Sequence, residues 1–239
     1  IKEYNFNSFL IGQQVPMTAP NPEFMQPGAV YGIGGYPNDG PELLQGNAGL
    51  TGTVTVQNVG TLSKAALLST TQAGTGALYM DTRPFAGGYL LTFAFDINIV
   101  DVPTTGLSQV AAGAPDGKAF GINVFGFDTA RLFGFGVAPT SATSGNFGYR
   151  TNNVNQDMVT FGTYNEGETH HVEFQVNFLT DTYDVWLDNI QVATAASLLN
   201  VGSGVSEAFV FMNGVNGQTN SVALDNMIIS VASVPEPTL

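Results

Sequence analysis

Apolar and polar side chains alternate along many short stretches of this chain, which is the pattern of β-strands that bury one face. Residues 91–99 place Leu, Phe, Phe, Ile and Ile at alternate positions, and residues 172–178 repeat the pattern with Val, Phe, Val and Phe. Because every second side chain projects to the same side of a strand, we expect these positions to form the core. The predicted strands cover residues 3–10, 53–59, 76–81, 89–100, 119–127, 131–137, 158–161, 170–179, 182–192, 208–212 and 222–231.

Turn residues between these runs predict how the strands are connected. The dipeptides Thr180-Asp181 and Asp188-Asn189 separate alternating runs, and such pairs favour tight hairpins. Many short strands with turns between them are typical of a β-sandwich, and 239 residues suffice for one large all-β domain. Loops are expected at residues 113–117 and 140–148, and short helical turns at residues 63–68 and 195–199.

The stretch from residue 12 to residue 49 breaks the alternation. Prolines recur there, among them Pro16, Pro27 and Pro41, and they disfavour both a central strand and a helix. We therefore expect a long irregular N-terminal arm within the domain. Arms of this length often carry function, so a binding loop, a segment lying on a neighbouring subunit and a plain surface crossover are all open interpretations.

The composition excludes several classes of protein. Charged residues make up only 10% of the chain, and 19 acidic side chains against 6 Lys and Arg give a net charge of −13. A surface of this sign repels nucleic acid and anionic lipid, so we expect neither as a partner. Cysteine is absent, which excludes disulfides and thiol chemistry. No apolar run approaches the ~20 residues that a membrane-spanning helix needs.

The segment from Glu168 to Phe174, followed by the run from Thr182 to Asn189, resembles the central hairpin of concanavalin A-like jelly rolls, including laminin-G-like domains. The resemblance implies an all-β fold with a single jelly-roll β-sandwich over residues 1–233. It concerns the fold and carries no activity by itself.

His170 and His171 are the only histidines of the chain. Adjacent residues of a strand point to opposite faces, so the two rings cannot readily share one metal ion, and we expect structural roles for them. Trp186 alternates with its apolar neighbours in the same way. Its ring is expected on the face opposite theirs, either as a platform for a sugar or in a second buried layer.

The end of the chain carries a second resemblance. Residues 223–229, followed by Val234, Pro235, Glu236 and Pro237, are similar to the close of a PEP-CTERM protein. The resemblance implies that residues 234–239 are the remnant of a sorting signal that an exosortase processes. It also implies a released protein, located outside a Gram-negative-type bacterium or on its outer surface.

A catalytic constellation is not evident from the spacing of the acidic residues. Glycoside hydrolysis needs two carboxylates that project from one face at a fixed separation. Glu166 and Glu168 flank a glycine in a predicted loop, whereas Asp96, Asp184 and Asp188 stand singly among apolar or turn residues. Serine-nucleophile, phosphate-loop and zinc motifs are also missing. We therefore expect no catalytic residues and no required cofactor.

Calcium is the metal that the acidic composition favours, because Ca²⁺ prefers hard oxygen ligands. Jelly-roll modules often tie the first strand to the last through Ca²⁺, and the resemblance places the equivalent ligands at Glu3, Asn5, Asn7 and Asp225. The alternative is that Asn5 and Asn7 bond only to neighbouring backbone.

Tyrosines in the predicted loops are candidates for contact with a glycan or with another subunit, because aromatic faces serve both purposes. These tyrosines are Tyr31, Tyr36, Tyr149 and Tyr164, and Trp186 is a fifth candidate of the same kind.

Three hypotheses of function follow from these observations. The first is a non-enzymatic, self-associating protein of the bacterial surface or biofilm matrix that assembles into filaments or homo-oligomers. The second is a lectin-like module that binds exopolysaccharide. The third is a secreted polysaccharide-degrading enzyme, which requires a pair of convergent carboxylates in a cleft.

Overall fold

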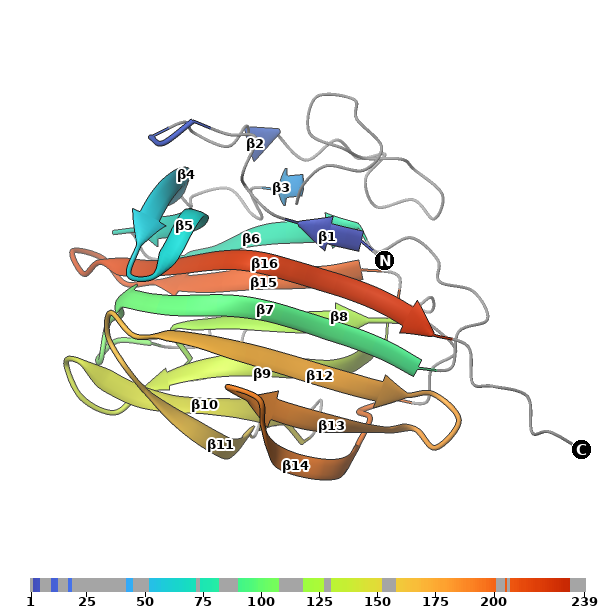
Figure 1. Ribbon diagram of the computed structural model, residues 1–239. Coiled ribbons are helices and arrows are strands. Elements are labelled where there is room, and N and C mark those ends of the chain that lie inside the picture. Colours follow the sequence, from blue (N-terminus) through green and yellow to red (C-terminus); the bar gives the residue numbers. More distant parts are fainter. Residues whose placement is uncertain are drawn as a thin grey trace, which may run out of the picture.

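The computed structural model describes residues 2–4, 10–12, 17–18, 42–44, 52–71, 74–81, 90–107, 118–126, 130–151, 158–200, 205 and 207–232. All regular elements in these residues are strands, and they form two sheets that stack as a sandwich (Figure 1). The predicted jelly-roll β-sandwich is therefore confirmed. Within the same residues, no helix is long and apolar enough to cross a membrane.

The first sheet has eight strands in the order β14-β13-β12-β7-β16-β5-β4, with β1 added beside β16. Its neighbours are antiparallel throughout. The strands are β1 (Lys2–Tyr4), β4 (Gly52–Val59), β5 (Leu62–Thr70), β7 (Leu90–Asp101), β12 (Thr169–Asn177), β13 (Thr182–Leu187), β14 (Ile190–Ser197) and β16 (Asn220–Ala232).

The second sheet also has eight strands, in the order β11-β10-β9-β8-β15-β6-β3-β2. Its pairs are antiparallel except β2 and β3, which run parallel. The strands are β2 (Met17–Thr18), β3 (Glu42–Leu44), β6 (Gly74–Asp81), β8 (Phe120–Phe125), β9 (Arg131–Pro139), β10 (Ser144–Arg150), β11 (Met158–Asn165) and β15 (Glu207–Gly214).

Phenylalanine rings from both sheets meet in the core. Phe95 of β7 lies edge-on to Phe135 of β9, with the ring centroids 5.2 Å apart, and Phe133 stacks on Phe174 of β12 at 5.1 Å. All four side chains are at most 1% exposed. The alternating positions predicted to face inward do so, because burying them removes the largest apolar area from water.

Two predicted hairpins are present, and one has a longer loop than expected. Asp188 and Asn189, with φ of 51° and 67°, form the two-residue turn between β13 and β14, and positive φ at both positions is the geometry of a type I′ hairpin turn. This turn divides the single strand predicted over residues 182–192. Between β12 and β13 the loop covers residues 178–181, so Thr180-Asp181 is only its second half.

Three local predictions are wrong, and pairing with neighbouring strands explains each. Residues 63–68 belong to β5, which pairs with β4 and β16, and residues 195–197 belong to β14. Tertiary contacts here outweigh the weak helix propensity of the alanine-containing segments. The glycine-rich loop expected at residues 140–148 includes much of β10, where a Cβ on Gly145 would lie 2.6 Å from the Tyr164 hydroxyl. Glycine is needed in this strand because it allows close packing.

The N-terminal arm is described only in part. Within residues 12–49, Met17–Thr18 and Glu42–Leu44 add two short strands to the edge of the second sheet. The rest of the arm beyond Gly12 lies outside the described residues, so its expected role stays a prediction.

Candidate functional site

A pocket of about 480 Å³ opens on the face of the first sheet that points away from the core. Asp96 lies between Phe95 and Ile97, and both of these are fully buried in the core, so the Asp96 side chain projects to the outer face. Strands β5, β7, β12 and β16 and two turns contribute to the wall. The lining residues are Thr61, Leu62, Ser63, Asp96, Thr169, His171, Asp188, Asp225 and Asn226.

Three titratable side chains form a row across neighbouring strands of this pocket. In the register of the sheet, Asp96 of β7 pairs with His171 of β12 on one side and with Asp225 of β16 on the other. Directly opposed residues of antiparallel strands have Cβ atoms about 4.5–5.5 Å apart. The row therefore concentrates two carboxylates and one imidazole within a single pocket.

A β-bulge in β16 shapes the floor of the pocket. Asp225 pairs with Asp96 and Ile228 with Ala94, so β16 has one more residue than β7 between these pairs. Asn226 takes up the extra position with φ of 47°, a conformation that asparagine tolerates better than most residues. The bulge places Asp225 and Asn226 together at the pocket, while Met227 returns to the core.

Asp96 is held as a carboxylate by its neighbours. The Nδ1–H of His171 donates to Asp96 Oδ1 at 2.6 Å, and the side-chain amide of Asn226 donates to Oδ2 at 2.7 Å. Burial raises the pKa of Asp96, but the hydrogen bonds from His171 and Asn226 and the charge of His171 outweigh it, so this pKa lies below its ordinary value. The hydrogen bond to Asp96 raises the pKa of His171 against the opposing effect of burial.

The pKa of Asp225 is displaced in the opposite direction, upward. Its residue is 6% exposed, and burial raises its pKa above the ordinary value. The backbone N–H of Asn226 lowers this pKa and the negative charge of Asp96 raises it further. Cross-strand carboxylates whose pKa values are displaced in opposite directions are the arrangement that separates a proton donor from an ionised base.

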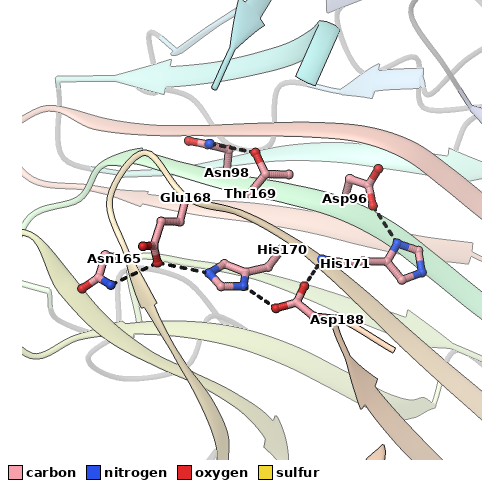
Figure 2. A network of polar contacts seen from close by, with 8 residues as sticks. All are labelled: Asp96, Asn98, Asn165, Glu168, Thr169, His170, His171 and Asp188. Atoms are coloured by element: carbon pink, nitrogen blue, oxygen red, sulfur yellow. Dashed lines mark hydrogen bonds and ion pairs between the residues drawn. The ribbon is translucent and has the colours of Figure 1, made fainter. Parts of the chain in front are cut away.

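Asp188 connects the two histidines from the turn between β13 and β14 (Figure 2). Its Oδ1 accepts the backbone N–H of His171 at 2.8 Å, and its Oδ2 lies 2.8 Å from His170 Nδ1. The His170 ring packs edge-on against Phe147 of the second sheet at 5.2 Å, whereas His171 lines the pocket. The two rings thus lie on opposite faces of β12, as predicted.

Nearby, Asn98 donates to Thr169 Oγ1 at 3.1 Å, and Asn165 donates to Glu168 at 3.0 Å (Figure 2).

The structure corrects the interpretation of single acidic residues. Asp96 and Asp188 do not stand alone, because both line the same pocket as Asp225. Asp96 and Asn226 are 130 positions apart in the chain, so no local spacing could have revealed their contact. The one available signal was the Asp225-Asn226 pair, which places two adjacent polar residues within the mostly apolar run of residues 222–231.

The predicted calcium ligands are only partly described. Glu3 lies in β1 beside Ile228, Asp225 lines the pocket, and Asn5 and Asn7 lie outside the described residues. Among the residues that the structure describes, no three His, Asp or Glu side chains are grouped so that they could hold a metal ion. Calcium binding stays a prediction.

The candidate aromatic residues separate into different environments. Tyr164 is in β11, only 1% exposed, and Tyr149 is in β10, partly buried and edge-on to Tyr183, so the expectation of exposed loop positions is wrong for both. Their rings are needed to complete the core. Trp186 is half-buried and pairs with Glu173, while Val185 is in the core, which agrees with the predicted opposite face.

The remaining predicted site residues are not described. Tyr31 and Tyr36, as well as the sorting remnant at Val234, Pro235, Glu236 and Pro237, lie outside the described residues. Processing by an exosortase and an extracellular location stay predictions.

Comparison with known proteins identifies the fold through solved structures alone. No protein-family model and no curated protein matches the chain. A sialidase superposes with a TM-score of 0.59 at 11% identity, over 80% of this chain and 17% of the sialidase chain. The alginate lyase A1-II′, a member of polysaccharide lyase family 7, superposes with a TM-score of 0.51 at 12% identity, over 76% of this chain and 84% of the lyase. Its complex with a substrate, GGMG, matches with the same TM-score and identity.

These structures contradict our predictions of a non-enzymatic matrix protein and of the absence of enzymatic activity. Chains with the same sandwich are a sialidase and alginate lyases, which are enzymes that act on carbohydrates. The prediction was wrong because it depended on finding no convergent carboxylates in the sequence, and the fold brings two together. At 11–12% identity the likeness itself establishes the jelly-roll fold.

Proposed function

We propose that this chain is a carbohydrate-active enzyme that hydrolyses glycosidic bonds in the pocket of the first sheet. The observation that carries the proposal is the cross-strand pair of Asp96 and Asp225, whose pKa values are displaced downward and upward respectively. Two carboxyl groups with divergent proton affinities are what acid–base cleavage of a glycoside requires. The sialidase and the alginate lyase that share the fold support an activity on carbohydrates.

Each residue of the row has a role in this proposal. Asp225 donates its proton to the glycosidic oxygen as the bond to the anomeric carbon breaks. The Asp96 carboxylate faces the positive charge that develops on that carbon. Water then adds its hydroxide to the anomeric carbon and returns a proton to Asp225. His171 and Asn226 are positioning residues, because they hold Asp96 ionised and oriented through both of its oxygens.

The experiment measures the release of reducing ends from a panel of polysaccharides by the intact chain and by Asp96→Asn and Asp225→Asn variants. Each substitution should lower kcat by about 10²- to 10⁴-fold, the usual contribution of one acid–base group. Asp181→Asn, in the loop between β12 and β13, removes one negative charge away from the pocket and should leave kcat unchanged. Glycan binding without cleavage by the intact chain, or full activity in both pocket variants, would overturn the proposal.

The pH profile provides a second measurement. Cleavage needs Asp96 ionised and Asp225 protonated, so the rate should be highest between their two pKa values, one below and the other above the ordinary value of 3.8. Asp225→Asn should remove the fall in rate at higher pH together with most of the rate. An optimum above neutral pH would contradict this assignment of roles.

A further inference from the structure

The charges around the pocket indicate which sugars it can bind. Three of its lining residues are aspartates. Glu173 lies on the same face of β12 as His171, and its carboxylate is 4.0 Å from His171 Nε2. No lining residue in the described part of the chain is Lys or Arg. Lys64, which follows the lining residue Ser63, is the nearest such residue in sequence.

His171 is the single basic residue of the lining that the structure describes, and it already pairs with a carboxylate of the protein. His171 is bonded to Asp96 through Nδ1, so its positive charge compensates that carboxylate. Asp188 and Glu173 then contribute the negative charge that remains, since Asp225 carries a proton in the proposed reaction. A sugar carboxylate entering this pocket would be desolvated next to like charges, and the lining that the structure describes offers no guanidinium or ammonium group to pair with it.

We infer that the sugar bound in this pocket carries no carboxylate, and that the pocket prefers amine-bearing or neutral glycans to polyuronates. The inference rests on the proposed function and narrows it to a substrate class. It also excludes for this pocket any reaction in which the enzyme must neutralise the carboxylate of a uronate, even though an alginate lyase shares the fold. A protonated sugar amine would find partners in Asp188 and Glu173, so amine-bearing glycans should bind most tightly.

The test compares the binding of three short oligosaccharides of equal length by calorimetry, at low and high salt. The probes are glucosamine, glucose and mannuronate oligomers, which carry positive, zero and negative charge at mildly acidic pH. The mannuronate oligomer should bind at least about tenfold more weakly than the glucose oligomer, as expected for one like-charge contact at partly screened distance. Added salt should weaken glucosamine binding, strengthen mannuronate binding and leave glucose binding unchanged.

Isosteric variants assign the effect to the pocket. Glu173→Gln should reduce the difference in affinity between the glucose and mannuronate oligomers. The matched control Asp181→Asn should leave this difference unchanged. Mannuronate binding that equals or exceeds glucose binding, or the absence of glucosamine binding, would show that the inference is wrong.

The same probes separate the two proposals. If mannuronate oligomers are cleaved, and cleavage depends on Asp225, the substrate class is wrong while the enzymatic proposal stands. If the non-anionic probes bind in the expected order but no glycan is cleaved, the substrate class stands and the enzymatic proposal is wrong.

Discussion

Asp225 is the direct cross-strand partner of Asp96, and both side chains line one pocket on the outer face of the first sheet. Asp96 receives hydrogen bonds from two side chains, whereas Asp225 is 6% exposed and is the more buried of the two residues. This asymmetry separates their proton affinities and makes specific outcomes measurable.

Asp225→Asn should stabilise the fold at neutral pH while it removes activity. Burial raises the pKa of Asp225 above its ordinary value of 3.8. Above pH 3.8 the carboxyl therefore ionises more readily in the unfolded chain than in the folded one, which lowers the free energy of unfolding. Urea unfolding at pH 7 should show a higher midpoint for the variant than for the intact chain, with a smaller difference near pH 4. Equal midpoints at both pH values would mean that the carboxyl is not perturbed.

His171→Gln should destabilise the fold mainly under mildly acidic conditions. The contribution of His171, whose pKa is raised, is fully present below its ordinary value of 6.5 and disappears as the pH rises through the folded-state pKa. The contribution of Asp96, whose pKa is lowered, is present above 3.8 and disappears as the pH falls through its folded-state value. The difference in melting temperature between the variant and the intact chain should therefore be largest between about pH 4 and pH 6.5. A difference that grows above pH 8 would contradict the ion pair.

Substitutions of Asn226 should separate the backbone conformation from the hydrogen bond. Asn226→Ala introduces a side chain that disfavours φ of 47° by about 1–2 kcal/mol and also loses the bond to Asp96. Asn226→Gly loses only the bond, because glycine adopts positive φ readily. Denaturant unfolding should rank the glycine variant as more stable than the alanine variant, and both should raise the pKa of Asp96 in NMR titrations. The reverse ranking would indicate that the bulge is not strained.

Asp188→Ala should loosen the turn that holds both histidines. The substitution removes the acceptor of the His171 backbone N–H and the partner of the His170 ring, at a cost of about 1–3 kcal/mol for groups left without partners. Asp188→Asn keeps an acceptor oxygen and tolerates φ of 51°, so it should cost less. Chemical unfolding measures both variants, and histidine ring NMR signals should shift more in the alanine variant. Equal, unperturbed spectra would exclude a positioning role for Asp188.

The order of strands along the chain was largely accessible from periodicity. The Leu, Phe and Ile positions of residues 91–99 and the Val and Phe positions of residues 172–178 alternate with polar residues, and a half-buried strand needs no other information. The turn at Asp188-Asn189 was likewise predictable, because few residues adopt positive φ in succession. Residues 63–68 and 144–150 escaped detection because their alanines and glycines have low strand propensity, and these segments form strands through pairing with their neighbours.

The sequence by itself determined the all-β architecture, the residues of the core and the acidic character of the surface, since these depend on side-chain type and local period. Only the tertiary structure decided that Asp96, His171 and Asp225 form one row, because the order and register of strands that are distant in sequence depend on the packing of the whole sandwich. The bulge at Asn226 illustrates the difference: its residue type was visible in the chain, but its effect on Asp96 exists only when β7 and β16 are paired.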